Sequence, residues 1–246
     1  MDLKGIIFDI NGTLIDILTD EGMEEIFRAI SHFLTYQGID LNRWQIKEQY
    51  EQIMEEQRRE SGEGFPEFDA VALWREFIRR HRKPSWPLAA AKVEQMPLFL
   101  AEIYRGISRQ RLRLYPGVRE VLEEWRGRYR LAVVSDGQSA WAMPEMRATG
   151  IHSFFRPIVI SGDHGFRKPD PRLFEKALAG MRLKPKNVVF VGNDMYRDIY
   201  GAGRVGMKTV FFSSNQGRKE MEGVAADYII YQFAEIRQAI AFLKQR

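Results

Sequence analysis

Acidic side chains stand at two points where an apolar run of the sequence ends. Asp9 follows the run 6–8, and Asp194 comes shortly after the run 188–191. Such runs predict strands buried on both faces of a parallel sheet, whose carboxyl ends meet at one edge. Carboxylates gathered at that edge would repel one another unless a cation joined them. Oxygen ligands without thiolates or a histidine cluster suit Mg²⁺. We therefore expect a magnesium site, with Lys168 balancing the remaining negative charge.

Four short loops hold most of the polar residues that could share this site. The loops are residues 9–13, 135–137, 168–171 and 192–194, and Asp198 follows the last of them. Each loop has an ordinary explanation when it is taken alone. Asn11 and Gly12 are typical of a tight turn, and Asp170 before Pro171 is typical of a helix start. Because each loop follows a predicted strand or precedes a predicted helix, their order along the chain favours one shared site.

The elements that must position these loops alternate along the second half of the chain. Short apolar runs predict strands at 3–9, 131–134, 158–160, 188–191, 209–212 and 228–230. Helical patterns fall at 116–128 and 141–149, and begin again near 170, 195 and 234. Strands that alternate with helices imply a parallel sheet covered on both faces. The predicted fold class is therefore α/β, with a doubly wound parallel sheet.

Between residues 20 and 109 the apolar residues recur at helical spacing, and this stretch has no convincing strand pattern. We expect an all-helical unit at 16–112, inserted into a core made of 1–15 and 113–246. Helical spacing places Trp74 in the core of the insert, whereas Trp44 and Trp86 fit a pocket lining equally well. The apolar helices could also form a dimer interface, so a monomer and a homodimer both stay open.

The composition excludes several classes of function. The chain of 246 residues has no cysteine, which excludes disulfides, thiolate zinc sites and a cysteine nucleophile. No apolar run reaches the roughly 18–20 residues of a membrane span, and the short first run is not typical of a signal peptide. We therefore expect a cytoplasmic protein without a membrane partner. The net charge of +4 and the basic run 79–83 at a helix end favour solvated surface charge over nucleic-acid binding.

In this order, the four loops resemble the four sequence motifs of the haloacid dehalogenase-like superfamily. The resemblance covers the core from Asp9 to beyond Asp198, and the helical insert stands where that family often carries a cap domain. It implies a hydrolase with a Rossmann-like core and an all-helical cap. It favours a Mg²⁺-dependent phosphatase that acts on a small phosphorylated metabolite through an aspartyl-phosphate.

The resemblance also implies which residues meet the substrate. Asp9 would be the nucleophile that forms the aspartyl-phosphate. Lys168 would stabilise charge on that nucleophile and on the transferring phosphoryl group. Ser135, Asp136 and Gly137 would bind the phosphoryl group together with Lys168, through the serine hydroxyl and a backbone N–H near Gly137.

For the metal, the resemblance implies a set of oxygen ligands around the nucleophile. Asp9, the backbone carbonyl of Asn11 and Asp194 would hold Mg²⁺, which would neutralise phosphate charge. Asp198 would orient Lys168 or a metal-bound water. The cap would close over the site, exclude water and choose the substrate.

Asn11 departs from the pattern, because phosphatases of this family resemble one another in having an aspartate there. That aspartate protonates the leaving group and then activates water, and an amide can do neither at neutral pH. An asparagine still donates a hydrogen bond, and its backbone carbonyl still binds metal. The substitution therefore leaves the binding site intact and predicts slow turnover, by a factor of ~10²–10⁴.

Several interpretations of this departure stay open. The chain is a slow phosphatase, one that uses another base such as Asp136 or His164, or one that prefers a leaving group needing no proton. It is alternatively a 2-haloacid dehalogenase that uses Asp9 without metal, although Asp194 would then repel the substrate carboxylate. Asn11 could also be an engineered change that traps a bound state. A non-catalytic protein that binds a phosphorylated ligand on the same core is the alternative from another class.

Overall fold

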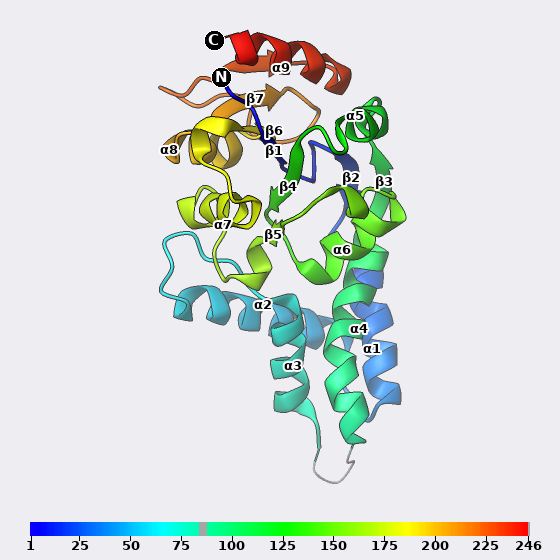
Figure 1. Cartoon of the computed structure of the whole chain (residues 1–246). Coiled ribbons are helices and arrows are strands. Elements are labelled where there is room, and N and C mark those ends of the chain that lie inside the picture. Colours follow the sequence, from blue (N-terminus) through cyan, green and yellow to red (C-terminus); the bar gives the residue numbers. More distant parts are fainter. Residues whose placement is uncertain (84–87, 246) are drawn as a thin grey trace.

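The computed structural model describes residues 1–83 and 88–245, and its centre is a six-stranded sheet (Figure 1). The strands lie in the order β5-β4-β1-β6-β7-β8. Their bounds are β1 Gly5–Phe8, β4 Arg130–Ser135, β5 Ile158–Ile160, β6 Val188–Gly192, β7 Lys208–Phe212 and β8 Tyr228–Ile230. Every neighbouring pair is parallel, which confirms the predicted α/β class with a doubly wound parallel sheet. The loops after β1, β4 and β6 therefore leave the sheet at one edge.

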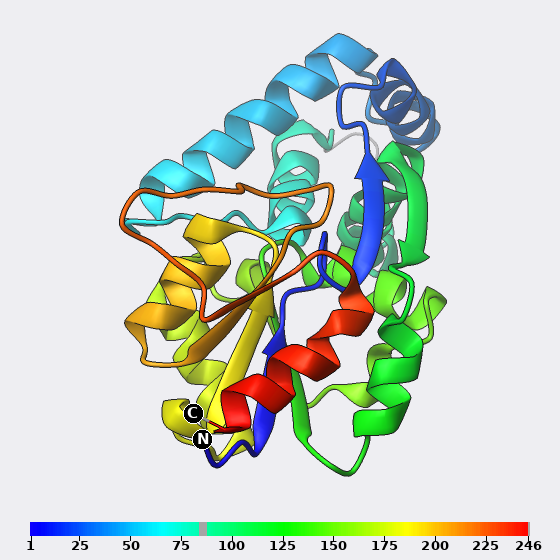
Figure 2. The ribbon, with the colours of Figure 1, turned by 90° about the horizontal axis from the view of Figure 1, so that it is seen from above.

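Helices cover both faces of the sheet because successive side chains of a strand point to opposite faces. Ile6 and Phe8 of β1 belong to a hydrophobic cluster with α5 and α9, whereas Ile7 belongs to a cluster with α7 and α8. The bounds of the covering helices are α5 Val118–Trp125, α6 Ser139–Ala148, α7 Pro171–Met181, α8 Gly201–Arg204 and α9 Ile236–Gln245. Figure 2 shows α9, in red, lying across one of the two faces.

A second group of helices stands beyond the carboxyl edge of the sheet (Figure 1). It consists of α1 Glu24–Tyr36, α2 Arg43–Glu60, α3 Ala70–His81 and α4 Ala90–Ser108. These helices share a hydrophobic core of their own, in which Trp74 is fully buried, as its spacing predicts. Trp44 is 63% exposed and lines no cavity described for the molecule, and Trp86 lies outside the described residues. Trp141 of α6 packs into the same core and joins it to the sheet domain.

The connection between the two parts differs from the sequence expectation. Strand β2 Ile15–Thr19 pairs with β3 Arg109–Leu114 in an antiparallel ribbon, and neither strand was predicted from the sequence. Their charged residues explain why: Asp16 is almost buried and accepts hydrogen bonds from Arg111 and Arg113 across the ribbon. Such a ribbon stabilises itself through cross-strand pairs of opposite charge, which leave no apolar run in the sequence.

Two predicted helices also begin or end elsewhere. The segment predicted as a helix from 195 starts with the π-helical turn Met195–Tyr200 and continues as α8. The helix predicted at 116–128 is shorter, because Gly117 precedes it with a φ of 88° and α5 ends at Trp125. No helix in the described ranges is long and apolar enough to cross a bilayer.

Candidate active site

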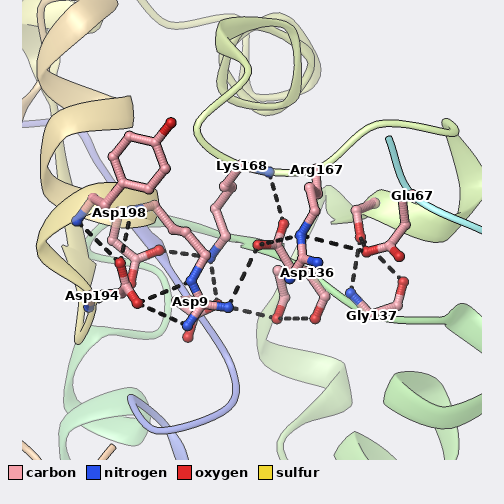
Figure 3. Close-up of polar contacts among 12 residues, drawn as sticks. Asp9, Glu67, Asp136, Gly137, Arg167, Lys168, Asp194 and Asp198 are labelled. Carbon is pink, nitrogen blue, oxygen red and sulfur yellow. Dashed lines mark hydrogen bonds and ion pairs between the residues drawn. The ribbon is translucent and has the colours of Figure 1, made fainter. Parts of the chain in front are cut away.

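Lys168 lies between two carboxylates at the carboxyl edge of the sheet (Figure 3). Its Nζ is 2.7 Å from Oδ1 of Asp9, which follows β1, and 2.6 Å from Oδ1 of Asp198, which lies in the turn after β6. All three side chains are almost completely buried. The structure thus brings together three residues that are far apart in the sequence, and it places Asp198 where it can orient Lys168.

Asp198 is itself held by the backbone. Its Oδ2 accepts hydrogen bonds of 3.0 Å from the N–H groups of both Asn193 and Asp194. A Cβ at Gly192 would lie 2.4 Å from Cγ of Asp198, so only a glycine lets the carboxylate approach the end of β6 so closely. The carboxylate that orients Lys168 is therefore fixed from two sides.

One ammonium group pairs with two carboxylates in a buried environment. Burial alone would lower the pKa of Lys168, but the carboxylates of Asp198 and Asp9 raise it overall, so the ammonium stays charged. Burial raises the pKa of Asp198, and the adjacent Lys168 opposes that rise. Losing Lys168 would leave both buried carboxylates without the cation that they share.

The loop after β4 supplies the second set of contacts. The hydroxyl of Ser135 donates a 3.1 Å hydrogen bond to Oδ1 of Asp9, and Oδ1 of Asp136 accepts one from the backbone N–H of Lys168. The backbone N–H of Gly137 donates to the hydroxyl of Ser161. Ser135, Asp136 and Gly137 all line the same cavity as Asp9, and their contact with a phosphoryl group stays a prediction.

The first loop turns tightly beneath the same cavity. Gly12 has a φ of 84°, and a Cβ there would lie 2.3 Å from the amide nitrogen of Asn193. Thr13 donates hydrogen bonds to Oδ1 of Asn193 at 2.9 Å and to Oδ2 of Asp9 at 3.4 Å. Oδ1 of Asn11 is buried and has no hydrogen-bond partner among the described residues. The predicted tight turn is confirmed, and the functional role of this loop stays a prediction.

The carboxylate of Asp194 is bound by groups outside the cluster of Asp9, Lys168 and Asp198. Its carboxylate accepts hydrogen bonds from the N–H groups of Tyr196, Arg197 and Arg218, and its Oδ2 lies 2.9 Å from the guanidinium of Arg197. Burial opposes ionisation, but these N–H groups and the guanidinium lower the pKa of Asp194 overall. Asp194 does not line the cavity, whereas its neighbour Asn193 does. Its predicted role as a ligand of Mg²⁺ stays a prediction that this arrangement does not favour.

The oxygen atoms that remain around Asp9 still suit a hard cation. They belong to the carboxylate of Asp9, the unpartnered Oδ1 of Asn11 and the amide Oδ1 of Asn193. Within residues 1–83 and 88–245, no three histidine, cysteine, aspartate or glutamate side chains gather around one point. Mg²⁺ commonly keeps several waters and uses one or two carboxylates plus substrate phosphate, so this donor set fits a loosely held ion.

The cavity has a volume of about 330 Å³ and lies between the sheet domain and the helical insert. The insert contributes Arg58, Glu67, Phe68 and Arg105, and the sheet domain adds Gln138, Trp141, Arg167 and Arg197 to the predicted residues. Sequence reasoning missed all of these. For Glu67 the available signal was its turn, because Gly62, Gly64 and Pro66 mark an ordered loop between helices.

The loop that carries Glu67 is attached to the sheet domain. Its backbone N–H donates to the carbonyl of Gly165, and Gln138 bonds to the backbone of both Phe68 and Ala70. Burial raises the pKa of Glu67, although Arg167 opposes the rise. The insert therefore closes the cavity on one side.

The two alternative bases suggested by the sequence are separated by the structure. Asp136 lines the cavity, and its Oδ2 lies 3.7 Å from Arg167 and 3.8 Å from Arg197. His164 stacks on Phe166, is not part of the lining, and has a pKa lowered by burial. Only Asp136 of this pair is placed to meet a substrate.

Comparison with known proteins identifies the family of this chain. Haloacid dehalogenase-like hydrolases match residues 3–206. The chain is 31% identical over 213 residues to a glyceraldehyde 3-phosphate phosphatase of Pyrococcus abyssi, covering 85% of this chain and 81% of that protein. It is 28% identical to the protein of the same name from Pyrococcus furiosus, covering 99% and 94%.

Solved structures show the same architecture. A 2-haloacid dehalogenase of Pseudomonas syringae superposes with a TM-score of 0.70 at 18% identity, covering 98% of this chain and 99% of that one. A phosphatase of Thermococcus onnurineus superposes with a TM-score of 0.58 at 21% identity, covering 97% and 98%. This chain belongs to the haloacid dehalogenase-like hydrolase family, and it is a hydrolase.

Replacing Lys168 by methionine tests the balance of charges in the site. We expect Lys168→Met to lower the free energy of unfolding by ~3–5 kcal/mol, because Asp9 and Asp198 then face each other without a cation. Adding Asp198→Asn should restore part of this loss. Urea denaturation at pH 7 measures both variants. Lys208→Met, which removes an exposed partner of Asp227, serves as the control with little effect. A double variant no more stable than the single one would contradict the prediction.

Proposed function

We propose that this chain hydrolyses phosphate monoesters of small molecules through an aspartyl-phosphate on Asp9. The observation that carries the proposal is the position of the Asp9 carboxylate, which lines the cavity beside Lys168 and Ser135. The names of the two relatives from Pyrococcus support phosphate ester chemistry. A further relative, from Thermus thermophilus and 30% identical over 59% of this chain, is named phosphoserine phosphatase.

The two oxygens of Asp9 are unequally engaged. Oδ1 accepts from Lys168 and Ser135, whereas Oδ2 has only the 3.4 Å contact with Thr13. In the first step an Asp9 oxygen bonds to phosphorus while the bond from phosphorus to the ester oxygen breaks. In the second step water attacks the phosphorus and frees the Asp9 carboxylate. Lys168 offsets negative charge in both steps because burial strengthens its interaction with the phosphoryl oxygens.

The proposal includes Mg²⁺ as the cofactor. Asp9, Asn11 and Asn193 would hold it, whereas Asp194, the further ligand predicted from the sequence, is paired with Arg197 and does not line the cavity. When bound, the ion supplies positive charge that lets an anionic nucleophile approach a phosphate dianion. The guanidinium of Arg197 lines the same cavity and adds a second fixed positive charge.

Asn11 limits which esters are hydrolysed quickly. No titratable side chain stands at this position, so the departing oxygen must leave as an anion or take its proton from elsewhere. Asp136 lines the cavity, but its Oδ2 faces the guanidinium groups of Arg167 and Arg197 at 3.7 and 3.8 Å. The proposed phosphatase is therefore slow with alkyl esters and faster with esters whose leaving group is a stable anion.

One observation favours a second candidate, the 2-haloacid dehalogenase. Asp194 is paired with Arg197 and does not line the cavity, so it would not repel the carboxylate of a haloacid. Displacement of halide by Asp9 needs no general acid, which fits an asparagine at position 11. The phosphatase-named relatives above 25% identity support phosphate chemistry, whereas the likeness to a dehalogenase at 18% identity shows the fold alone.

Release of phosphate from 4-nitrophenyl phosphate tests the proposal. The wild-type chain should release phosphate with Mg²⁺, lose activity with a chelator and regain it with added Mg²⁺. Asp9→Asn should reduce release to the background, because the amide is not nucleophilic. Asp40→Asn, at an exposed position of the insert, is the matched control.

Other outcomes of the same assay separate the alternatives. Halide release from 2-chloropropionate without metal, together with no phosphate release, would favour the dehalogenase. Thermal stabilisation by phosphorylated compounds without any product would favour a binding protein.

Restoring an acid at position 11 should accelerate turnover. We expect Asn11→Asp to raise kcat for an alkyl phosphate by ~10²-fold or more, because the new carboxyl group can protonate the leaving oxygen. The gain should be much smaller for 4-nitrophenyl phosphate, whose leaving group needs no proton. Asn11→Ala supplies the control for loss of the amide. Equal gains for both esters would show that position 11 does not act through proton transfer.

A further inference from the structure

Arg58 is a cation of the helical insert that reaches the active-site cavity. It lies in the last turn of α2 and lines the cavity above Asp9 together with Phe68 and Trp141. The same three residues line a second cavity of about 310 Å³ among the helices of the insert. Arg58 therefore stands where the reaction cavity continues into the insert, on the side away from the sheet.

Unlike its neighbours, Arg58 has no anionic partner. Among the described residues that line the reaction cavity, every other cation lies within 4.0 Å of a carboxylate: Arg105 near Glu145, Arg167 near Glu67 and Asp136, Lys168 near Asp9 and Asp198, and Arg197 near Asp194. No carboxylate of the described residues lies within that distance of Arg58. Its Nε is buried without a hydrogen-bond partner, and its guanidinium carbon lies 5.1 Å from the centre of the Phe68 ring.

The half-buried Arg58 has one N–H donor, at Nε, that is shielded from water without an acceptor, and such an unpaired donor is costly. The planar fork of an arginine matches a carboxylate or a phosphate with two parallel hydrogen bonds. Glu21 and Glu51 line the second cavity but not the cavity that contains Asp9. An anion bound by Arg58 is therefore favoured on the side that faces Asp9.

We propose that the leaving group of the substrate carries a second anionic group, a carboxylate or a further phosphate, which Arg58 binds. This inference rests on the proposed phosphatase function and names its substrate class. The phosphoryl group meets Asp9, Lys168 and Ser135, and the second anion meets Arg58 at the far side of the same cavity. Binding at both ends would orient the ester bond over Asp9.

Matched pairs of esters test this inference. The first pair is 3-phosphoglycerate and glycerol 3-phosphate, which differ by a carboxylate. The second is the bisphosphate and the monophosphate of propane-1,3-diol. Steady-state kinetics on the whole chain should give a kcat/KM ratio above ten for the anionic member of at least one pair, since charge-assisted hydrogen bonds change affinity by about 10–100-fold. The pair that responds identifies the second anion.

Variants of Arg58 and of its neighbour Arg59 test whether Arg58 causes the difference in kcat/KM. Arg58→Gln should lower that ratio by about 10–100-fold, mainly through KM, and Arg58→Lys should restore part of it. Arg59→Gln removes an exposed arginine that pairs with Glu60, and it should keep the wild-type ratio. Thermal unfolding checks that each variant is folded.

The outcomes separate this inference from the proposed function. Phosphate release from all four esters with ratios near one, or equal losses for both members of a pair in Arg58→Gln, would overturn the inference and leave the phosphatase standing. Release from none of them, nor from 4-nitrophenyl phosphate, would overturn the proposed function. Calorimetric measurement of the binding of 3-phosphoglycerate and the bisphosphate would then decide whether Arg58 binds a second anion. Binding of either one that Arg58→Gln abolishes supports the second-anion site, and binding of neither, or binding that the variant retains, overturns it.

Discussion

The site depends on the two contacts that the ammonium group of Lys168 makes, one with Asp9 and one with Asp198. Three charges are removed from water at once, and such burial is tolerable only when each charge meets an opposite one at short range. The parallel sheet makes this possible because the loops after β1 and β6 leave it at the same edge. Gly192 lets Asp198 approach that edge, and backbone N–H groups fix it there. The carboxylate of Asp9, the proposed nucleophile, is thus held next to the ammonium group of Lys168 by the fold itself.

The centre of the sheet was predictable because strands β1 and β6 are buried along their whole length. Continuous apolar runs predicted β1 and β6. The polar residues after these runs predicted that Asp9 belongs to the site. Ser135 and Lys168 followed from their order along the chain. The sequence did not predict which of Asn193 and Asp194 lines the cavity. Consecutive side chains at a strand end point in different directions, and capping of the following turn draws Asp194 away to Arg197. The contributions of the insert, Arg58 and Glu67, depend on packing between parts distant in sequence.

Two amides distinguish this site. Asn11 and Asn193 stand beside Asp9, so the cavity floor carries fewer negative charges than a cluster of carboxylates would. In the proposed function, such a floor would bind Mg²⁺ through few carboxylates and would repel a phosphate less. The arginines that line the cavity, with one of them unpaired, shift its balance further toward anions. In the proposed function, the insert would recognise the substrate and the sheet would position the nucleophile.

The covalent step on Asp9 is the central claim, and chemical trapping measures it most directly. The chain would be mixed with a phosphate ester, quenched in acid during the first turnover, reduced with borohydride and analysed by mass spectrometry of the peptide that contains Asp9. The account predicts reduction of the Asp9 side chain only when the ester was present, because an acyl phosphate is reducible and a carboxylate is not. Release of phosphate with an unmodified Asp9, or trapping on another residue, would contradict it.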